Sequence, residues 1–476
     1  MPYSFIFLGA GASRPFEIPT MQEMVDEFES FLEAKDMKLF SLYTDIKQIQ
    51  SEGYKSRNVD IESVYSVVYG LAKGTPLDEM GHLSFYYMAK KFDVKNFKIS
   101  NQEEAKELQK IMEVFIKSKC KSPLSDAEII KMYETTYDPF FTLLDTERAG
   151  YSGNRAYAMH WKAYGTNYDN VFEDFWHDDI TLQDFFVPDG QSQNFVFNPN
   201  QNPQEKCYIK LHGSIDWKKR KDDNKVMKKA PGVSRHQIVG DVMIFPIQQK
   251  DMYLYPWYIQ FQHLKNSLNA IPNWYVIGYS FNDEFILEIF KEAFTKSTKL
   301  IIIGPSADKI REKFPKDYHD RIFALPIKFG DRYFPEQFKN FKEQRKLIRF
   351  KIKTPSQFIG ISSTLPLLEA QISPQEKTKV DGSSFDPATG VARFTVTHPP
   401  DVEVEFELTV VHKGPFDKDL SVQLLLNAPY PYEMSGYVYD KQIITLNGKT
   451  QNQDPVTNLY PSETITIKAS DLFVKT

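Results

Sequence analysis

Short apolar runs and amphipathic segments succeed one another along the first 330 residues. Residues 3–8 form an apolar run that suits a strand buried on both faces. Between about residues 20 and 147, apolar positions instead recur at intervals of three and four, as on amphipathic helices. Further apolar runs, several of them ending in a small residue, follow at 158–165, 207–211, 274–278, 300–304 and 322–327. This order predicts an α/β domain with a parallel sheet and a large helical insertion after the first strand.

The pattern changes after residue 345, where apolar and polar residues alternate. Segments such as ARFTVTH and LSVQLLLN are separated by Pro, Gly and Asn, and LNGK carries the Asn-Gly signal of a tight hairpin. We expect an immunoglobulin-like β-sandwich of about 100 residues. The predicted domains are therefore an α/β domain over 1–345, with its helical insertion over about 20–147, and a β-sandwich over 380–476.

Composition excludes several classes of protein. The 476 residues are 41% hydrophobic and 25% charged, as in ordinary globular proteins, and the net charge of −5 does not favour direct nucleic-acid binding. Cys120 and Cys207 are far apart in the sequence and form no CxxC pair, which argues against a disulfide framework and a cysteine zinc site. We expect no signal peptide, no membrane span and a cytoplasmic location.

A glycine-rich turn follows the first apolar run. It reads Gly9-Ala10-Gly11-Ala12-Ser13, and glycines at such a turn let the backbone approach a pyrophosphate, as in Rossmann-like folds. A dehydrogenase would carry an acidic residue at the end of a second strand about 20 residues later. That position falls in the helical segment VDEFESFLE, so a redox role is disfavoured. A glycine-rich turn without a ligand is the alternative interpretation.

Three later motifs identify a candidate family. They are GTNYDNVFEDF at 165–175, KLHGSIDW at 210–217 and VIGYSFNDE at 276–284. Together with GAGAS, and in this order, they resemble the sirtuin-like family of NAD-consuming enzymes, in particular a bacterial antiphage-defence branch. The resemblance covers roughly residues 1–330, and NVDIESVYS at 58–66 also resembles that branch. It implies NAD as the substrate.

The resemblance also implies roles for individual residues. Cleavage between ribose and nicotinamide passes through an oxocarbenium-like state. Asn167 would orient a water or the nicotinamide ribose, and His212 would act as general base. The cofactor-binding residues would be Gly9, Ala10, Gly11, Ala12, Ser13, Thr166, Asp169, Gly278, Ser280 and Asp283.

Each of these side chains also has a structural interpretation. His212 could cap a turn, Asn167 and Asp169 could be Asx-turn residues, and Asp283 could cap a helix. Glu62 belongs either to a plain amphipathic helix or to the wall of a nicotinamide pocket. The sequence leaves these alternatives open.

One departure from the family affects the predicted reaction. Sirtuin deacetylases carry a four-cysteine zinc module, which two cysteines cannot form, and PFEIPTM lacks their Asp-Phe-Arg after the glycine loop. No metal is therefore predicted, and water becomes the natural acceptor. The predicted activity is an NAD glycohydrolase (NADase) that releases nicotinamide and ADP-ribose. An NAD-dependent protein deacylase or ADP-ribosyltransferase, and a non-enzymatic nucleotide-sensing scaffold, are the alternatives.

The predicted biological context rests on the resemblance and on domain layout. An α/β domain followed by a β-sandwich resembles the defence proteins that assemble with a HerA-like hexameric ATPase. We therefore expect an abortive-infection effector that acts in a homo-oligomer, with the sandwich serving assembly. The basic segment 218–229 is interpreted as a solvated loop.

Overall fold

The chain divides into two compact units, residues 1–137 with 151–302 and residues 138–150 with 303–476. The computed structural model describes residues 4–53, 59, 61–74, 100–145, 161–176, 182–189, 195–203, 206–223, 225–228, 238–243, 257–365, 367–374, 379–386, 391–398, 403–414, 418–450, 452–455 and 458–472. Within these residues, no helix is both long and apolar enough to cross a membrane.

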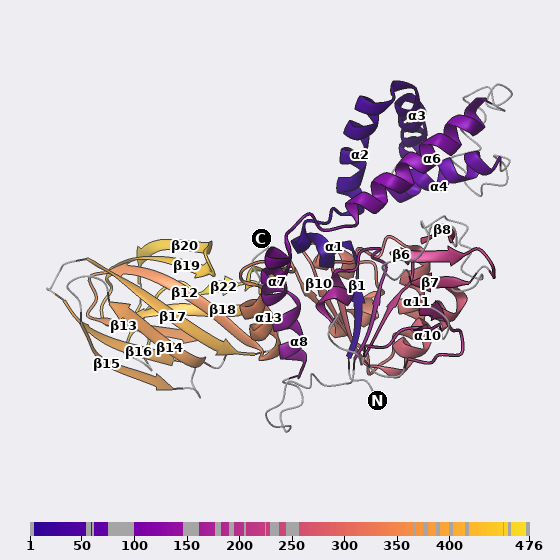
Figure 1. Ribbon diagram of the computed structural model, residues 1–476. Helices are drawn as coiled ribbons and strands as arrows, with labels where there is room; N and C mark the ends of the chain where they lie inside the picture. Colours follow the sequence, from indigo (N-terminus) through magenta and orange to yellow (C-terminus); the bar gives the residue numbers. More distant parts are fainter. Residues whose placement is uncertain are drawn as a thin grey trace. The chain divides into compact units, whose positions relative to one another are not determined.

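In the first unit, the strands of the central sheet have the order β10-β9-β1-β2-β5, and β1 and β10 are labelled in Figure 1. Every pairing given for this sheet is parallel, as the sequence predicts: β1 pairs with β2 and β9, and β2 pairs with β5. All five residues of β1 are buried, which explains why its sequence is a continuous apolar run. The strands are β1 (Ser4–Leu8), β2 (Trp161–Gly165), β5 (Cys207–Lys210), β9 (Asn273–Ile277) and β10 (Lys299–Ile303).

Helices cover this sheet through aromatic contacts. The ring of Phe290, in α11 (Glu284–Ala293), meets the rings of Phe5 and Phe7 edge-on, with centroid distances of 5.7 and 5.3 Å. Phe5 and Phe7 are two residues apart in a strand and therefore face the same side of the sheet. The helix α10 (Trp257–Ala270) precedes β9 and packs beside α11.

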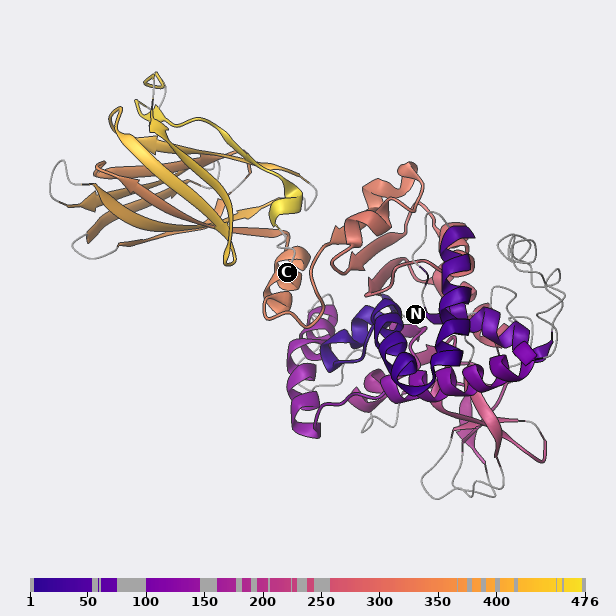
Figure 2. The same cartoon turned by 90° about the horizontal axis from the view of Figure 1, so that it is seen from above.

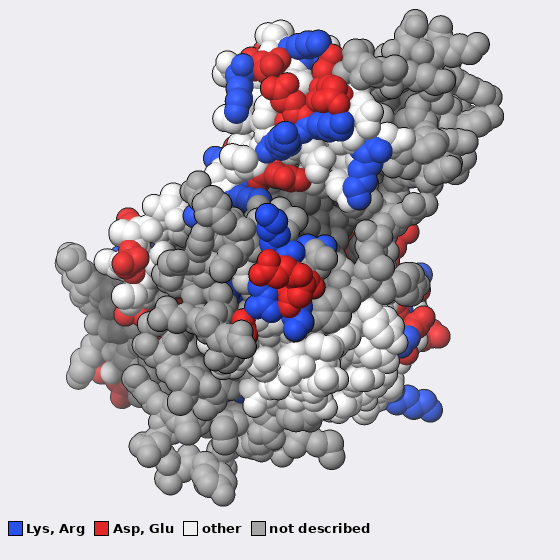
Figure 3. Space-filling view, turned by 45° about the vertical axis from the view of Figure 1, so that its right-hand side comes forward, with Lys and Arg blue, Asp and Glu red and all other residues white. Residues whose placement is uncertain are grey.

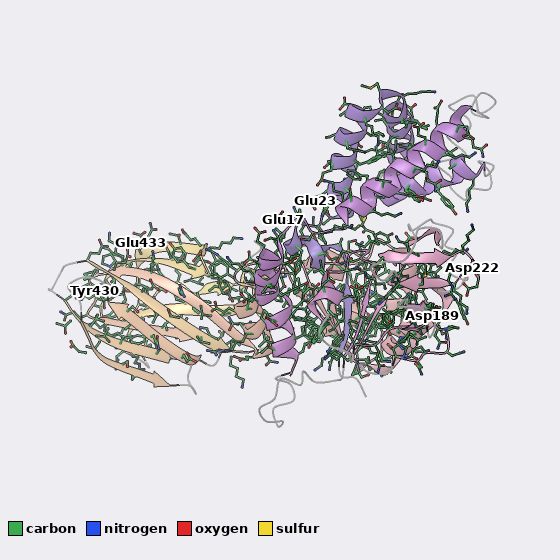
Figure 4. The ribbon with its side chains drawn as sticks, in the orientation of Figure 1. Glu17, Glu23, Asp189, Asp222, Tyr430 and Glu433 are labelled. Carbon is green, nitrogen blue, oxygen red and sulfur yellow. The ribbon has the colours of Figure 1, made fainter. Side chains whose placement is uncertain are left out.

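The predicted helical insertion lies between β1 and β2 in the sequence, and most of its described residues are helical (Figure 2). Thr20 and Glu23 form a capping box at its first long helix; Glu23 is labelled in Figure 4. One hydrophobic core joins α2 (Met21–Lys35), α3 (Met37–Gly53), α4 (Ile61–Lys73) and α6 (Ser100–Lys119). The helices α7 (Asp126–Thr135) and α8 (Tyr137–Asp145) follow in sequence.

A small antiparallel sheet after β2 is absent from the sequence prediction. Its order is β3-β4-β7-β6-β8, and the strands are β3 (Phe186–Pro188), β4 (Phe195–Phe197), β6 (Gly213–Arg220), β7 (Val226–Lys228) and β8 (Ile238–Met243). The segment 218–229 is thus not simply a solvated loop, because Lys218 and Lys219 pair with Met227 and Val226. Three of these strands have only three residues, too few to establish a periodic pattern.

The second unit contains nearly all of α8, and from residue 303 on it consists of short elements followed by two antiparallel sheets. The short elements are α12 (Ala307–Arg311), β11 (Ile322–Leu325) and α13 (Phe334–Lys342). The first sheet has the order β14-β17-β12-β19-β20, with β12 (Arg345–Thr354), β14 (Leu367–Pro374), β17 (Val404–Lys413), β19 (Pro431–Val438) and β20 (Lys441–Lys449). The second contains β13 (Phe358–Ser363), β15 (Lys379–Asp386), β16 (Val391–Thr397), β18 (Leu420–Leu426), β21 (Tyr460–Pro461) and β22 (Ile465–Ile467).

These sheets are compatible with a β-sandwich. Alternate residues of β12 and β16 are buried, as expected of strands with one face on a core. The strand pairings place β12, β13 and β14 in the same sheets as the later strands, so the antiparallel sheets begin at Arg345.

The predicted Asn-Gly hairpin is wrong. Asn447 and Gly448 lie within β20, where they pair with Glu433 and Tyr432 of β19. The turn between these strands lies instead at Tyr439 and the residue after it, between the paired ends of the two strands. Tyr439 has a φ of +54°, so an aromatic residue occupies the left-handed conformation that Asn or Gly usually supplies.

Candidate functional site

The carboxyl ends of three neighbouring parallel strands meet at one edge of the central sheet. Leu8, the last residue of β1, is paired with Gly165 at the end of β2 and with Ile277 at the end of β9. The glycine-rich turn, the TNYD segment and the GYSFND segment follow these three strands, and LHG follows β5 beside β2. The topology therefore places all four motifs at the edge where α/β proteins bind ligands.

The glycines of the first motif bring two loops into backbone contact. The N–H of Gly9 donates to the carbonyl of Ile277 at 3.0 Å, and the N–H of Gly11 donates to that of Gly278 at 2.9 Å. A Cβ on Gly11 would lie 2.7 Å from the Cα of Gly278, which itself has a φ of +63°. These two N–H groups thus hold the neighbouring loop, and the glycines are required for close packing of the backbone.

Asn167 connects the end of β2 to the glycine-rich turn. Its Nδ2 donates to the carbonyl of Gly9 at 2.9 Å and to Oγ of Ser13 at 2.8 Å, and its side chain is buried. Both contacts are far away in sequence, so an Asx turn does not describe its role. An amide nitrogen carries two protons. With both donated to the protein, the side-chain oxygen is the group with which Asn167 can contact a substrate.

Asp169 lies in the same segment and combines two roles. Its Oδ1 accepts the N–H of Val171 at 3.1 Å, which is the Asx turn considered from the sequence, and it also accepts a hydrogen bond from Ser13. Burial raises the pKa of this carboxyl, against the effects of nearby Lys210 and of these hydrogen bonds. Ser13 therefore joins Asn167 and Asp169 beneath the glycine-rich turn.

His212 and Asp283 come together from different strand ends. The Nε2 of His212 lies 3.9 Å from Oδ2 of Asp283, and both side chains are largely buried. The other oxygen of Asp283 caps α11 by accepting the N–H groups of Phe285 and Ile286, at 3.0 and 3.4 Å. The capping interpretation is thus confirmed, and one carboxylate also faces the histidine.

The other predicted residues differ in their accessibility. The N–H of Thr166 donates to the carbonyl of Leu8 at 3.2 Å, and this bond continues the pairing of β1 with β2. Ala12 is buried, Ala10 is half-buried and Ser280 is exposed. The side chain of Glu62 and most of the segment 58–60 lie outside the described residues.

The sequence analysis missed a buried lysine at this edge. Lys210 ends β5 and is 2% exposed, and its Nζ contacts Glu173, Asn170 and Ser214. A lysine at the end of the otherwise uncharged strand CYIK is the signal that would have identified it. A buried lysine requires partners for its charge.

Neither cysteine is suited to nucleophilic chemistry. Cys120 and Cys207 are both buried, and burial raises the pKa of the Cys207 thiol to about 12. Among the described residues, no group of three or more His, Cys, Asp or Glu could hold a metal ion. On the face shown in Figure 3, acidic and basic side chains lie next to one another rather than forming a patch of one sign.

Comparisons with known proteins give one family match, over part of the chain. Residues 163–323 match the model of the SIR2-like domain, a range that includes Asn167, His212 and Asp283. Among solved structures, a Sir2 homologue mutant in complex with ADP-ribose shares 12% identity over 69% of this chain and 88% of its own, with a TM-score of 0.28. A complex of Sir2 with a p53 peptide and NAD+ shares 11% identity over 71% of this chain and 94% of its own, also with a TM-score of 0.28. No curated protein matches the chain.

Proposed function

We propose that this chain is an NAD hydrolase that cleaves NAD to nicotinamide and ADP-ribose. The observation that carries the proposal is the position of Asn167, which is hydrogen-bonded to the glycine-rich turn at the strand edge where His212 and Asp283 also meet. The SIR2-like match supports NAD as the substrate, because it covers three of the four motifs at this edge.

The roles follow from the chemistry of the bond that breaks. In NAD the nicotinamide ring carries a positive charge. This charge moves onto the ribose as the bond between them lengthens, and nicotinamide leaves as a neutral molecule. The oxygen of Asn167 would orient the attacking water or a ribose hydroxyl. His212 would take the proton from that water, and the carboxylate of Asp283 would stabilise the resulting imidazolium.

The proposed cofactor-binding residues line the same edge. They are Gly9, Ala10, Gly11, Ala12, Ser13, Thr166, Asp169, Gly278, Ser280 and Asp283. Gly9 and Gly11 would contribute through the shape of the turn, because their N–H groups already donate to the carbonyls of Ile277 and Gly278. Asp169 would act through Ser13, which lies between it and Asn167.

Water is the proposed acceptor because a four-cysteine module is impossible with two cysteines. We also propose that the enzyme is a cytoplasmic abortive-infection effector that acts in a homo-oligomer, with a HerA-like ATPase as the candidate partner. Uncontrolled hydrolysis would exhaust the NAD of the host cell, so control by assembly gives the activity a switch. The antiparallel sheets of the second unit are the proposed assembly region.

The experiment is NAD turnover by the purified full chain, followed by chromatography of nicotinamide and ADP-ribose. We expect turnover in the wild type, and in an Asn200→Ala control whose side chain is exposed on a turn. Asn167→Ala and His212→Ala should lose about a hundredfold or more in rate. Turnover that appears only with an acylated peptide would favour the deacylase, and absence of turnover in every assembly state would favour the nucleotide-sensing scaffold.

A further inference from the structure

Lys210 is a charged side chain in the interior of the first unit. It is 2% exposed, and its Nζ lies 2.8 Å from Oδ1 of Asn170, 2.7 Å from Oγ of Ser214 and 2.7 Å from Oε1 of Glu173. An ammonium has three protons, and these three contacts, together with the carbonyl of Tyr168 at 3.4 Å, account for all of them. The contacts of Lys210 are therefore internal to the protein and are not directed toward a substrate.

The partners of Lys210 belong to two segments that carry the proposed catalytic residues. Asn170 lies three residues after Asn167, and Ser214 lies two residues after His212. Ser214 itself donates to Oδ1 of Asn170 at 2.9 Å, so the lysine and the serine share one acceptor. This cluster joins the segment after β2 directly to the segment after β5.

Backbone contacts at Tyr168 reinforce the same connection. The carbonyl of Tyr168 accepts the N–H of Ile215 at 3.0 Å and lies 3.4 Å from Nζ of Lys210. The ring centroid of Tyr168 lies 6.4 Å from that of His212. Since Tyr168 directly follows Asn167, a displacement of its carbonyl would move both proposed catalytic side chains relative to each other.

We propose that Lys210 is a positioning residue that fixes the segment of Asn167 against the segment of His212 in the geometry that NAD cleavage requires. This inference rests on the proposed function. A buried ammonium is costly to desolvate, and its removal leaves Glu173 without its ion-pair partner. If Lys210 only balances the charge of Glu173, removal of both charges together should restore kcat. If Lys210 positions the two segments, kcat should stay low in the double variant.

The test compares Lys210→Met, Glu173→Gln and the double variant. Lys210→Met keeps a long side chain without the charge, and it should lower both the melting temperature and kcat. The double variant removes the unpaired carboxylate, so its melting temperature should return toward that of Glu173→Gln. Its kcat should stay about a hundredfold below that of Glu173→Gln, because a small misplacement of reacting groups costs about that much. Recovery of kcat together with stability would overturn the proposal.

Ser214→Ala is a milder variant that keeps both charges. It removes one acceptor of Lys210 and one donor to Asn170. We expect about a tenfold loss in kcat, with KM within about threefold, because hydrogen bonds are lost that align the segments but do not bind NAD. A wild-type kcat in this variant would contradict the proposed link between the segments.

The His212 ring provides a readout that does not depend on turnover. Its imidazole NMR signal can be assigned by its loss in His212→Gln, and it should shift in the double variant relative to Glu173→Gln alone. An unchanged signal would overturn the positioning role. If the wild type releases no nicotinamide, the proposed function fails, and the His212 signal still decides whether Lys210 positions this segment.

Discussion

Buried polar side chains have different partners in the two units of the chain. In the first unit, Asn167 is bound to the turn after β1, and Lys210 is bound to side chains from two other segments. In the second unit, the buried imidazole of His398 contacts the carbonyl of Ser356 at 3.0 Å, and that of His412 contacts Oγ of Ser363 at 3.1 Å. The first arrangement joins the segments that follow β1, β2 and β5 into one network, whereas His398 and His412 contact different serines.

This difference follows from the two kinds of sheet. Alternation in the antiparallel sheets sends most polar side chains outward, and an occasional buried one is satisfied by a nearby group. Parallel strands instead end together at one edge, so polar residues from distant parts of the sequence converge there. Convergence of polar groups, rather than their burial alone, distinguishes a candidate site from a structural contact.

The largest expected effect separates two buried histidines. His212→Gln should lower the rate of NAD cleavage about a hundredfold or more, because the proposed general base is lost. His412→Gln should leave this rate unchanged, because His412 lies in a strand of the second unit. Initial rates of nicotinamide release check both, with melting temperatures as the folding control. Equal losses of rate in the two variants would contradict the distinction between a catalytic and a structural histidine.

Two glycines, one in each unit, extend the comparison of the units to the free energy of unfolding. A Cβ on Gly11 would meet the backbone of Gly278 at 2.7 Å, whereas a Cβ on Gly382 in β15 would meet nothing within 4 Å. Gly11→Ala should therefore cost about 3 kcal/mol of unfolding free energy, and Gly382→Ala should stay within about 0.5 kcal/mol. Denaturant unfolding measures both values. A mild Gly11→Ala would show that the two loops do not require their close approach.

The pH dependence of stability involves one histidine in each unit. Burial lowers the pKa of His263 and of His412 to about 4. The unfolded chain therefore binds more protons between pH 6.5 and 4, so stability should fall as the pH is lowered through this range. Each histidine should contribute about 3 kcal/mol to the fall. Unfolding at several pH values should show a shallower slope in His412→Gln, and an unchanged slope would contradict this account.

The smallest expected effect distinguishes the roles of the two side-chain oxygens of Asp283. Asp283→Ala should lose the cap of α11 and about 1 kcal/mol of stability, whereas Asp283→Asn should retain most of it. Both variants should lower NAD cleavage, because both remove the carboxylate that faces His212. Activity that stayed at the wild-type level in Asp283→Asn would limit this residue to helix capping.

Much of the arrangement of the candidate site could be predicted, because its motifs follow strands with clear sequence patterns. The apolar run before Gly9 and the run before Thr166 predict parallel strands, and parallel strands bring their following residues together. The role of Asn167 is different, since its contacts with Gly9 and Ser13 depend on the exact approach of two segments. No spacing in the sequence contains that information.

Other features were unpredictable for identifiable physical reasons. Strands of three residues, such as β3 and β7, are too short to show a period. The Asn-Gly pair at 447–448 led to the wrong prediction of a hairpin, because pairing with β19 overrides its local turn preference. In the sequence, Lys210 is only one charged residue at the end of a strand. Its contacts with Asn170, Glu173 and Ser214 form only in the folded chain.

Nicotinamide release from NAD by the purified full chain tests the central claim most directly, with the wild type compared with Asn167→Ala. The account predicts that the wild type forms equal amounts of nicotinamide and ADP-ribose without any peptide. It also predicts that Asn167→Ala, with an unchanged melting profile, falls at least about a hundredfold in rate. Equal rates in the two proteins, or no release by the wild type in any assembly state, would contradict it.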